Sequence, residues 1–443
     1  MGARALLGDA TVNGEQLMDE PLRHQAVRLL TEFKGDRYSY GPGAMDRLGE
    51  YVGDLGRRAV VFAGKTARAI GGVDQIAEAV AASGGEVVSV LDAARPNAPK
   101  EDVQAMADGL AAAGEVDCAV VVGGGSAIDA LKGAVVLRCL GGELEAYYGV
   151  GLVSKTLAER GGALLNTVAV MTAASSAAHL TRYSNVTDLK RGQKKLIIDD
   201  AVVPPRAVFD YAVTTGMGKA FTQDGALDGI GHSLEVYLGA TASPDYDQIE
   251  RIALTGIELI VTHLSAAVDE PDDLEARTAL GLGTDLGGYA IMTGGTSGPH
   301  LNSFSMVDIL SHGRAVAILN PYYTVFFAPA CERQLRRLAD LYARAGHLQG
   351  ETSALHGRDL GLAVADAMLA LAEKVGFPTR LSAVPGFSDE HVRRCLSAAK
   401  NPQLRSKLEN MPVPLSPEAV DEYMGALLEA AVNGQPQHVK NLS

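Results

Sequence analysis

The 443-residue sequence has no tryptophan, and aromatic residues make up only 5% of it. Glycine is abundant at 50 residues, and few aromatics with many glycines favour tight βα turns over an all-β sandwich. The hydrophobic fraction of 47% and the charged fraction of 21% are near globular averages. This composition excludes a largely disordered chain.

Cysteine is scarce, and the four residues present form no CxxC pair: Cys118, Cys139, Cys331 and Cys395. We therefore expect free thiols in a reducing cytoplasm rather than a disulfide framework. No run reaches the roughly 18 apolar residues that span a bilayer. Residues 1–20 include four acidic side chains and no apolar stretch, so they predict no signal peptide.

Basic residues are outnumbered by acidic ones, 39 against 53, which gives a net charge of −14. This balance disfavours nucleic acid and anionic membranes as partners. The expected partners are a small-molecule substrate and further copies of the chain in a homo-oligomer.

Short apolar runs alternate with helical patterns in the first half of the chain. Strands are predicted at 58–63, 86–91, 117–122, 167–171 and 207–209. Their continuous apolar character is typical of parallel strands covered on both faces. Helical spacing of Val103, Met106 and Leu110 predicts a helix over 101–113. The alternation predicts a doubly wound α/β domain.

Strand signals nearly vanish after Tyr211. Helices are predicted at 252–268, 274–292, 332–345 and 359–375, with a polar loop at 349–358. The sequence therefore predicts a peripheral extension over residues 1–30, an α/β domain over 31–211 and an all-α domain over 212–443.

A glycine-rich turn follows the strand predicted at 117–122. Gly123, Gly124 and Gly125 precede Ser126, which is predicted at an N-cap, and then a helix that includes Asp129. Bare backbone N–H groups at a helix N-terminus fit a pyrophosphate. The alternative is an ordinary Gly-rich βα turn, and the GxxxxGK[ST] and GxGxxG spacings are both missing.

Two further segments carry candidate metal ligands. Asp228 and His232 share one face of a predicted helix, although a simple Asp–His helix pair is the alternative. His300 and His312 can reach the same ion only if the helix ends between them, and Ser311-His312-Gly313 resembles such an ending. Three imidazoles and one carboxylate suit Fe²⁺ or Zn²⁺.

Taken in order, these motifs resemble the iron-containing (group III) alcohol dehydrogenases, which have a dehydroquinate synthase-like fold. The resemblance runs from about Tyr38 to the end of the chain. It includes Tyr40-Gly-Pro-Gly43, Arg95-Pro-Asn97, Gly123-Gly-Gly-Ser126 with Asp129, Asp228-x-x-x-His232 and His312-Gly313. It implies a metal and nicotinamide site in the cleft between the two domains.

The resemblance also implies site residues. The metal ligands are Asp228, His232, His300 and His312, and the cofactor-binding residues are Gly64, Asn97, Gly123, Gly124, Gly125, Ser126, Asp129, Thr172 and Lys195. No catalytic residue is expected beyond the ligands. The family's TTAGTGSE-like segment reads Thr172-Ala-Ala-Ser-Ser-Ala-Ala-His179 here, Phe304 replaces a second histidine, and the interval from His300 to His312 is short.

The implied activity is hydride transfer between NAD(P)(H) and a small alcohol or aldehyde, with Fe²⁺ or Zn²⁺ as the metal. NADP(H) is favoured because Gly64 replaces an acid and is followed by Lys65 and Arg68. The alternatives are a dehydroquinate synthase-like lyase, a polyol-phosphate dehydrogenase, or a nucleotide-binding protein without turnover. A phosphate substrate would need clustered cations, and none adjoin the metal motifs in sequence.

Overall fold

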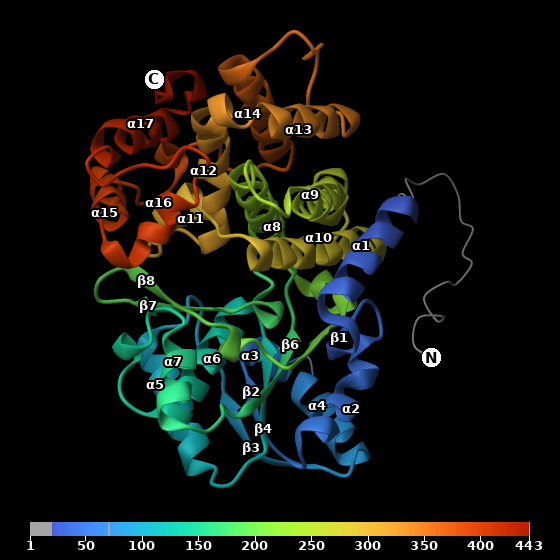
Figure 1. Cartoon of the computed structure of the whole chain (residues 1–443). Helices are drawn as coiled ribbons and strands as arrows, with labels where there is room; N and C mark the ends of the chain where they lie inside the picture. Colours follow the sequence, from blue (N-terminus) through green and yellow to red (C-terminus); the bar gives the residue numbers. More distant parts are fainter. Residues whose placement is uncertain (1–19, 70, 443) are drawn as a thin grey trace.

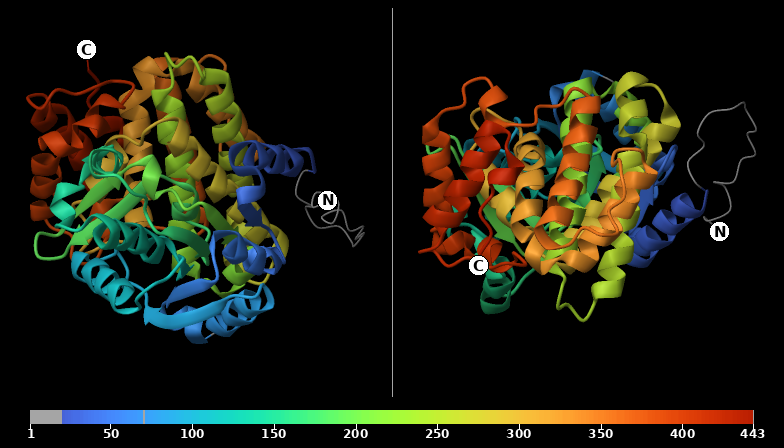
Figure 2. Two further views of the ribbon diagram at one scale, coloured as in Figure 1. Left: turned by 60° about the horizontal axis from the view of Figure 1, so that its bottom comes forward. Right: turned by 90° about the horizontal axis from the view of Figure 1, so that it is seen from above.

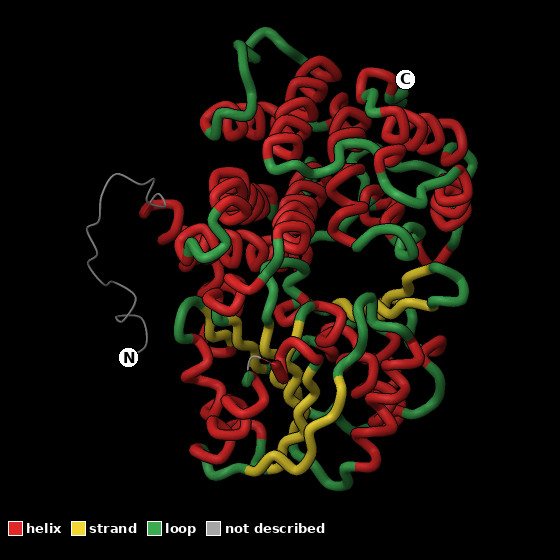
Figure 3. The backbone as a smooth tube through the Cα atoms, turned by 180° about the vertical axis from the view of Figure 1, so that it is seen from behind, coloured by secondary structure: helices red, strands yellow, loops and turns green. Residues whose placement is uncertain are grey.

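The computed structural model describes residues 20–69 and 71–442, so residues 1–19 of the predicted extension lie outside it. Figure 1 shows the strands gathered in one part of the molecule and the long helices of the second half of the chain in the other. The tube in Figure 3 shows the same division from behind. An α/β part and a helical part are thus present, as the sequence predicts.

The α/β part is built on parallel strands. The strands are β1 Tyr38–Tyr40, β2 Arg58–Ala63, β3 Glu86–Asp92, β4 Cys118–Gly123, β5 Gly149–Val150, β6 Asn166–Met171, β7 Tyr183–Asp188, β8 Gln193–Ile198 and β9 Arg206–Phe209. The larger sheet has the order β1-β9-β6-β4-β2-β3, and all its pairs are parallel. This confirms the five strands predicted from apolar runs.

The chain reverses direction across this sheet between β2 and β4. From β2 it moves outward to β3, and then returns to β4 and continues through β6 to β9 on the other side. The carboxyl ends of β2 and β4 therefore flank a topological switch point, which is where open α/β sheets bind ligands. Gly64 follows β2, and Gly123 ends β4.

Helices cover the sheet and form the second part. The α/β part contains α2 Leu48–Leu55, α3 Lys65–Ala69, α4 Gly72–Ala82, α5 Lys100–Ala112, α6 Gly125–Leu140 and α7 Leu152–Arg160. The helical part contains α8 Lys219–Gly239, α9 Tyr246–Asp269, α10 Leu274–Thr293, α11 Gly298–Ser303, α12 His312–Phe327, α13 Glu332–Arg344, α14 Gly357–Lys374, α15 Asp389–Ala399, α16 Arg405–Glu409 and α17 Gly425–Asn433. The predicted helices are confirmed, with boundaries shifted by a few residues.

The helix α1 (Glu20–Lys34) belongs to the fold and is not a peripheral segment. It buries Ala26, Leu29 and Leu30, and Gln25 Nε2 donates to Thr255 Oγ1 of α9 at 2.7 Å. Figure 2 places α1 and the C-terminal helices on opposite sides of the molecule. Residues 20–30 of the predicted extension therefore pack against the helical part.

The helix α9 is long and apolar enough, by length and composition, to cross a membrane. It packs against α8 and α10, and 67% of its most apolar window is buried inside the protein. We identify it as a core helix. All four cysteines are free thiols, as predicted, and three of them are buried.

A second, three-stranded sheet of β5, β8 and β7 lies where the two parts meet. The strands β7 and β8 are antiparallel, and Thr187 pairs with Lys194 and Val186 with Lys195. Side chains of paired residues share a face, and successive residues alternate between faces. Lys194 and Lys195 therefore point to opposite sides of this sheet.

Candidate metal and cofactor site between the two parts

The helix α8 presents the first two candidate ligands. Asp228 and His232 lie on the same face and are buried, at 3% and 4% exposure. The helix is enclosed by α9, α10 and α12, because glycines along it allow close approach. A Cβ at Gly229, for example, would lie 2.9 Å from Thr284 Cγ2. The predicted pair on one helical face is present.

His300 and His312 lie on two separate helices. One ion can bind both residues only if the helix is interrupted between them. The helix α11 carries His300 and ends at Ser303, and α12 begins at His312. The expected helix ending at Ser311-His312-Gly313 is wrong, because Ser311 is the N-cap of α12 and its Oγ accepts from Arg314 N at 3.3 Å. This segment begins a helix.

A glycine brings α12 onto α8. A Cβ at Gly313 would lie 2.3 Å from the carbonyl oxygen of Asp224 and 2.9 Å from Asp228 Cβ. Since backbone cannot move aside cheaply, only glycine allows this approach. The contact brings His312, the residue before Gly313, beside Asp228.

The four candidates converge. One ligand atom from each of Asp228, His232, His300 and His312 lies within 4.8 Å of the others. Asp228 Oδ1 and His300 Nε2 are buried without a hydrogen-bond partner and lie 3.8 Å apart. Orphaned buried acceptors are rare in proteins, so a divalent cation fits this donor set.

Burial shifts the pKa values of three of the four candidate ligands. Burial lowers the pKa of His232 and of His312 well below the usual range, with a smaller contribution from neighbouring cations. Both rings are therefore neutral at pH 7, which is the form that binds metals. Burial raises the pKa of Asp228 to about 6, and His300 partly offsets this effect.

Glu235 is a site residue that sequence reasoning missed. Its Oε1 lies 2.6 Å from His300 Nδ1, and its Oε2 accepts from Ser297 N at 2.7 Å. The carboxylate only accepts, so the ring proton sits on Nδ1 and Nε2 faces the cluster with its lone pair. The signal was present: Glu235 follows Asp228 by two helical turns and shares its face.

The glycine-rich turn joins β4 to α6. Gly124, not Ser126, is the N-cap of α6, so the predicted N-cap is wrong by two residues. Ser126 Oγ instead accepts from Asn97 N at 2.9 Å, and Asn97 has a left-handed backbone with φ of 68°. Thr172 N, after β6, donates to Gly123 O at 3.2 Å. The predicted residues of this loop lie together at the switch point.

Asp129 lies one turn into α6 and faces the interior. Its Oδ2 accepts from Asn185 Nδ2 at 2.9 Å, while Oδ1 has no hydrogen-bond partner and lies 3.7 Å from Lys132 Nζ. Lys132 itself donates to the carbonyls of Ala178, Thr181 and Tyr183. It thereby holds the segment after Thr172 against α6.

Gly64 stands at the carboxyl end of β2 with open space around it, since a Cβ there would meet nothing within 4 Å. Lys65 is exposed. Arg68 donates to Asp92 at 3.1 Å and to Leu91 O at 2.9 Å, so it links the ends of β2 and β3. The sequence did not indicate that Arg68 forms an ion pair with Asp92.

The two adjacent lysines of β8 have different surroundings. Lys195 Nζ lies 3.8 Å from Glu145 Oε1 and 5.2 Å from the centroid of the Tyr148 ring. Lys194 is buried on the other face, where burial lowers its pKa to about 8 and Asp129 and Asp228 partly offset the effect. The two side chains thus lie on opposite faces of the sheet, and the predicted role of Lys195 remains a prediction.

His179 and Phe304, the two departures from the family pattern, occupy different places. His179 Nε2 lies 3.0 Å from Tyr38 Oη and 3.4 Å from Asp285 Oδ1 in a buried polar group. Tyr211 Oη also donates to Asp285, at 2.8 Å. Phe304 stacks on the His312 ring with centroids 5.8 Å apart. His179 thus joins the two parts, while Phe304 covers the candidate ligand His312.

One pocket brings the two sets of residues together. It encloses about 440 Å³ of empty space, including its open mouth. The residues lining it from the α/β part include Asp129, Ser176, Tyr183 and Asn185, and those from the helical part include His232, Thr296, His300, Phe304, His312 and Lys407. The three candidate histidines therefore face residues beside the glycine loop.

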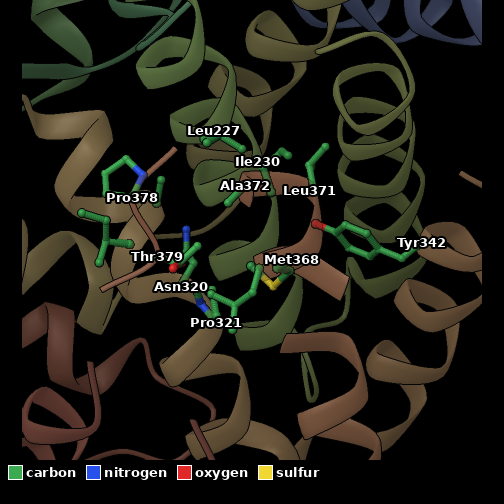
Figure 4. Close-up of a pocket in the computed structure, with 13 residues that line it drawn as sticks. Leu227, Ile230, Asn320, Pro321, Tyr342, Met368, Leu371, Ala372, Pro378 and Thr379 are labelled. Carbon is green, nitrogen blue, oxygen red and sulfur yellow. The ribbon is translucent and has the colours of Figure 1, made fainter. Parts of the chain in front are cut away.

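A different cavity lies within the helical part (Figure 4). Its lining is mainly apolar and comes from α8, α12, α13, α14 and the segment after α14, with Leu227, Ile230, Tyr342, Met368 and Leu371 among the residues. None of the four candidate ligands lines it. Its chemistry is that of a packing defect rather than of a reaction site.

Known proteins share this architecture. The long-chain-alcohol dehydrogenase 1 of Geobacillus thermodenitrificans is 27% identical over 397 residues, covering 89% of this chain and 94% of that protein. The NAD-dependent methanol dehydrogenase of Bacillus methanolicus is 25% identical, covering 68% and 77%. A crystal structure of 1,3-propanediol oxidoreductase superposes with a TM-score of 0.76 at 25% identity, covering 89% of this chain and 98% of that one.

Two family descriptions together match most of the chain. Residues 35–211 match "Iron-containing alcohol dehydrogenase", and residues 222–427 match "Fe-containing alcohol dehydrogenase family, C-terminal". The matches cover both the α/β part with its glycine loop and the helical part with its ligand cluster. The chain therefore belongs to the iron-containing alcohol dehydrogenase family.

Proposed function

We propose that the protein transfers hydride reversibly between NAD(P)(H) and a small alcohol or aldehyde. The observation that carries this proposal is the shared pocket, where the three histidines of the converging cluster line the same space as Asp129 and Ser176 beside the glycine loop. We infer that Asp228, His232, His300 and His312 hold Fe²⁺, with Zn²⁺ as the alternative. The glycine loop, Asn97, Thr172 and the end of β2 would hold the dinucleotide.

When bound, the divalent ion supplies a Lewis acid for the substrate oxygen, and the nicotinamide carries the hydride. The chain's own residues orient and shield these groups. Glu235 holds the His300 proton on Nδ1 at 2.6 Å, which keeps Nε2 available as a ligand. Phe304, which is 1% exposed, excludes water from one side of His312. Lys132 donates to the carbonyls of Ala178 and Thr181 and so fixes this segment, which lines the pocket on the α/β side.

Cofactor selection concerns the end of β2. We propose that NADP(H) is accepted and preferred, because Gly64 leaves no carboxylate to repel a 2′-phosphate and has open space beside it. Arg68 is paired with Asp92, so the exposed Lys65 is the better placed cation for the phosphate. We propose that Lys195 approaches the nicotinamide ribose, while Lys194 lies buried on the opposite face of the β7–β8 sheet.

Three other functions compete with this proposal. A dehydroquinate synthase-like lyase or a polyol-phosphate dehydrogenase would use the same fold, and loss of turnover would leave a nucleotide-binding protein. The intact cluster of candidate ligands argues against loss of turnover. Asp228 Oδ1 and His300 Nε2 are buried without a hydrogen-bond partner, which costs free energy unless a cation binds them. The free thiols support a cytoplasmic location.

The test is a screen of Fe²⁺- and Zn²⁺-loaded protein with small aldehydes, following oxidation of NADH and NADPH by absorbance. We expect turnover and one bound ion per chain. His232→Ala and His312→Ala should lose both, while His356→Ala, at an exposed histidine paired with Glu332, should lose neither. Unchanged metal content in the first two variants would refute the ligand assignment.

A further inference from the structure

The pocket contains a buried lysine that hydride transfer does not require. Lys407 lies on α16, is 4% exposed and lines the same pocket as His232, His300 and His312. Its Nζ donates to Thr296 Oγ1 and lies 5.8 Å from the centroid of the Tyr183 ring. Figure 1 shows α16 beside α11, at the edge of the helical part that faces β7 and β8.

No carboxylate neutralises this lysine. Within residues 20–69 and 71–442, no acidic oxygen lies within 4.0 Å of Lys407 Nζ. The carboxylate that affects it most is Glu235, but the two oxygens of Glu235 already accept from His300 and Ser297. An ammonium has three N–H donors, so Lys407 retains donors beyond the one that Thr296 occupies. A buried charge with unused donors is costly unless a partner binds it.

The other charges around the pocket do not supply that partner. Asp129 is held by Asn185 and lies near Lys132, and Asp228 belongs to the ligand cluster. A divalent ion with one carboxylate and three neutral imidazoles carries a net positive charge. Lys194 adds a second buried cation from the β8 side. The pocket is therefore electropositive when it holds its metal.

We propose that Lys407 and Thr296 bind an anionic group of the substrate, so that the substrate is a small aldehyde or alcohol bearing a carboxylate, sulfonate or phosphonate. This inference rests on the proposed function, since it places the oxygen that reacts at the ligand cluster and the anion at Lys407. Lys407, Thr296 and the three candidate histidines line one pocket, so a single small substrate can reach both groups. Burial lowers the pKa of Lys407 to about 8, and Glu235 partly offsets this effect.

The experiment compares aldehydes of one chain length. Butanal and succinic semialdehyde differ in a terminal carboxylate, and the matching sulfonate and phosphonate test the other anions. The metal-loaded protein should show kcat/KM at least about tenfold higher for one or more charged aldehydes, the effect of a charge-assisted hydrogen bond. Lys407→Met should remove this preference, and Lys407→Arg should keep part of it. Lys400→Met, at an exposed lysine paired with Asp421, should keep it fully.

A binding measurement separates this inference from turnover. Calorimetry on the metal- and cofactor-loaded protein should detect γ-hydroxybutyrate, or its sulfonate or phosphonate analogue, and show weaker binding of butanol. Lys407→Met should lose this difference while it retains its metal. If no aldehyde is reduced but the anion still binds through Lys407, the proposed function fails and the anion site stands. Equal kcat/KM values for all four aldehydes in the parent protein, or anion binding unchanged in Lys407→Met, would overturn the inference.

Discussion

Replacing Glu235 by glutamine tests whether the charge behind His300 sets the metal site. Glu235 is 1% exposed, and its oxygens accept from His300 Nδ1 at 2.6 Å and from Ser297 N at 2.7 Å. Glutamine has the same shape, but it has only one accepting end. The substitution therefore removes one acceptor and one charge without creating a cavity.

The substitution should weaken metal binding, because His300 can change its tautomer to suit the amide whereas the backbone N–H of Ser297 can only donate. The backbone N–H of Ser297 always donates, so the oxygen of the introduced amide has to face it. The amide NH₂ then faces His300 Nδ1, which must become an acceptor. In a neutral imidazole the proton consequently moves to Nε2, the atom that lies 3.8 Å from Asp228 Oδ1. The ring would present a proton to the cation instead of a lone pair.

We expect the metal affinity of Glu235→Gln to fall by about 10- to 100-fold, the usual effect of losing an outer partner of a metal-bound histidine. This corresponds to about 1.4–2.8 kcal/mol. The assay is a competition titration of metal-free protein with Zn²⁺ and a chelator, at pH 7. Retention of the fold is checked by circular dichroism.

The control is Glu250→Gln. Glu250 Oε2 accepts from the hydroxyls of Tyr237 and Tyr246, and a glutamine oxygen can accept both bonds unchanged. This variant should bind metal as the parent does. Equal metal affinity in Glu235→Gln and the parent, or equal losses in both variants, would refute the tautomer argument.

Three further predictions concern the cofactor and pH. Gly124→Val should weaken dinucleotide binding by at least about tenfold and leave the metal in place. A Cβ at Gly124 meets only Ala173 Cβ, at an ordinary 3.8 Å, but projects where the pyrophosphate is expected. Titration with NADPH checks this, and unchanged affinity would contradict the assignment of the loop to the pyrophosphate. Gly64→Asp should shift preference from NADP(H) toward NAD(H) by about 1–3 kcal/mol of differential binding, whereas a parent protein that already prefers NADH would contradict the assignment. Metal affinity should fall by about tenfold per pH unit as acidification passes the Asp228 pKa of about 6, since the proton competes with the cation, and a flat profile from pH 7 to 5 would contradict this.

Much of the fold could be predicted because the signals are local. Continuous apolar runs located β2, β3, β4, β6 and β9, of which all but the edge strand β3 are mostly buried, and helical periodicity located the long helices. The strands that were missed are short or polar: β7 reads Tyr-Ser-Asn-Val-Thr-Asp, and β8 begins Gln-Lys-Lys. Such strands owe their pairing to the neighbouring parts of the fold, so their own residues carry a weak signal. The division at residue 211 stays a prediction.

The sequence by itself also determined the chemistry available: the glycine loop, the Asp228 and His232 pair one turn apart, and two more histidines. Only the tertiary structure decided which groups meet. Chain reversal at β2 and β4 gathers Gly64 and the loop, and Gly313 lets α12 carry His312 onto α8. Strand alternation puts Lys194 and Lys195 on opposite faces of their sheet, and α16 brings Lys407 into one pocket with candidate ligands far away in the chain. These juxtapositions depend on packing between distant segments, and periodicity within one segment holds no information about them.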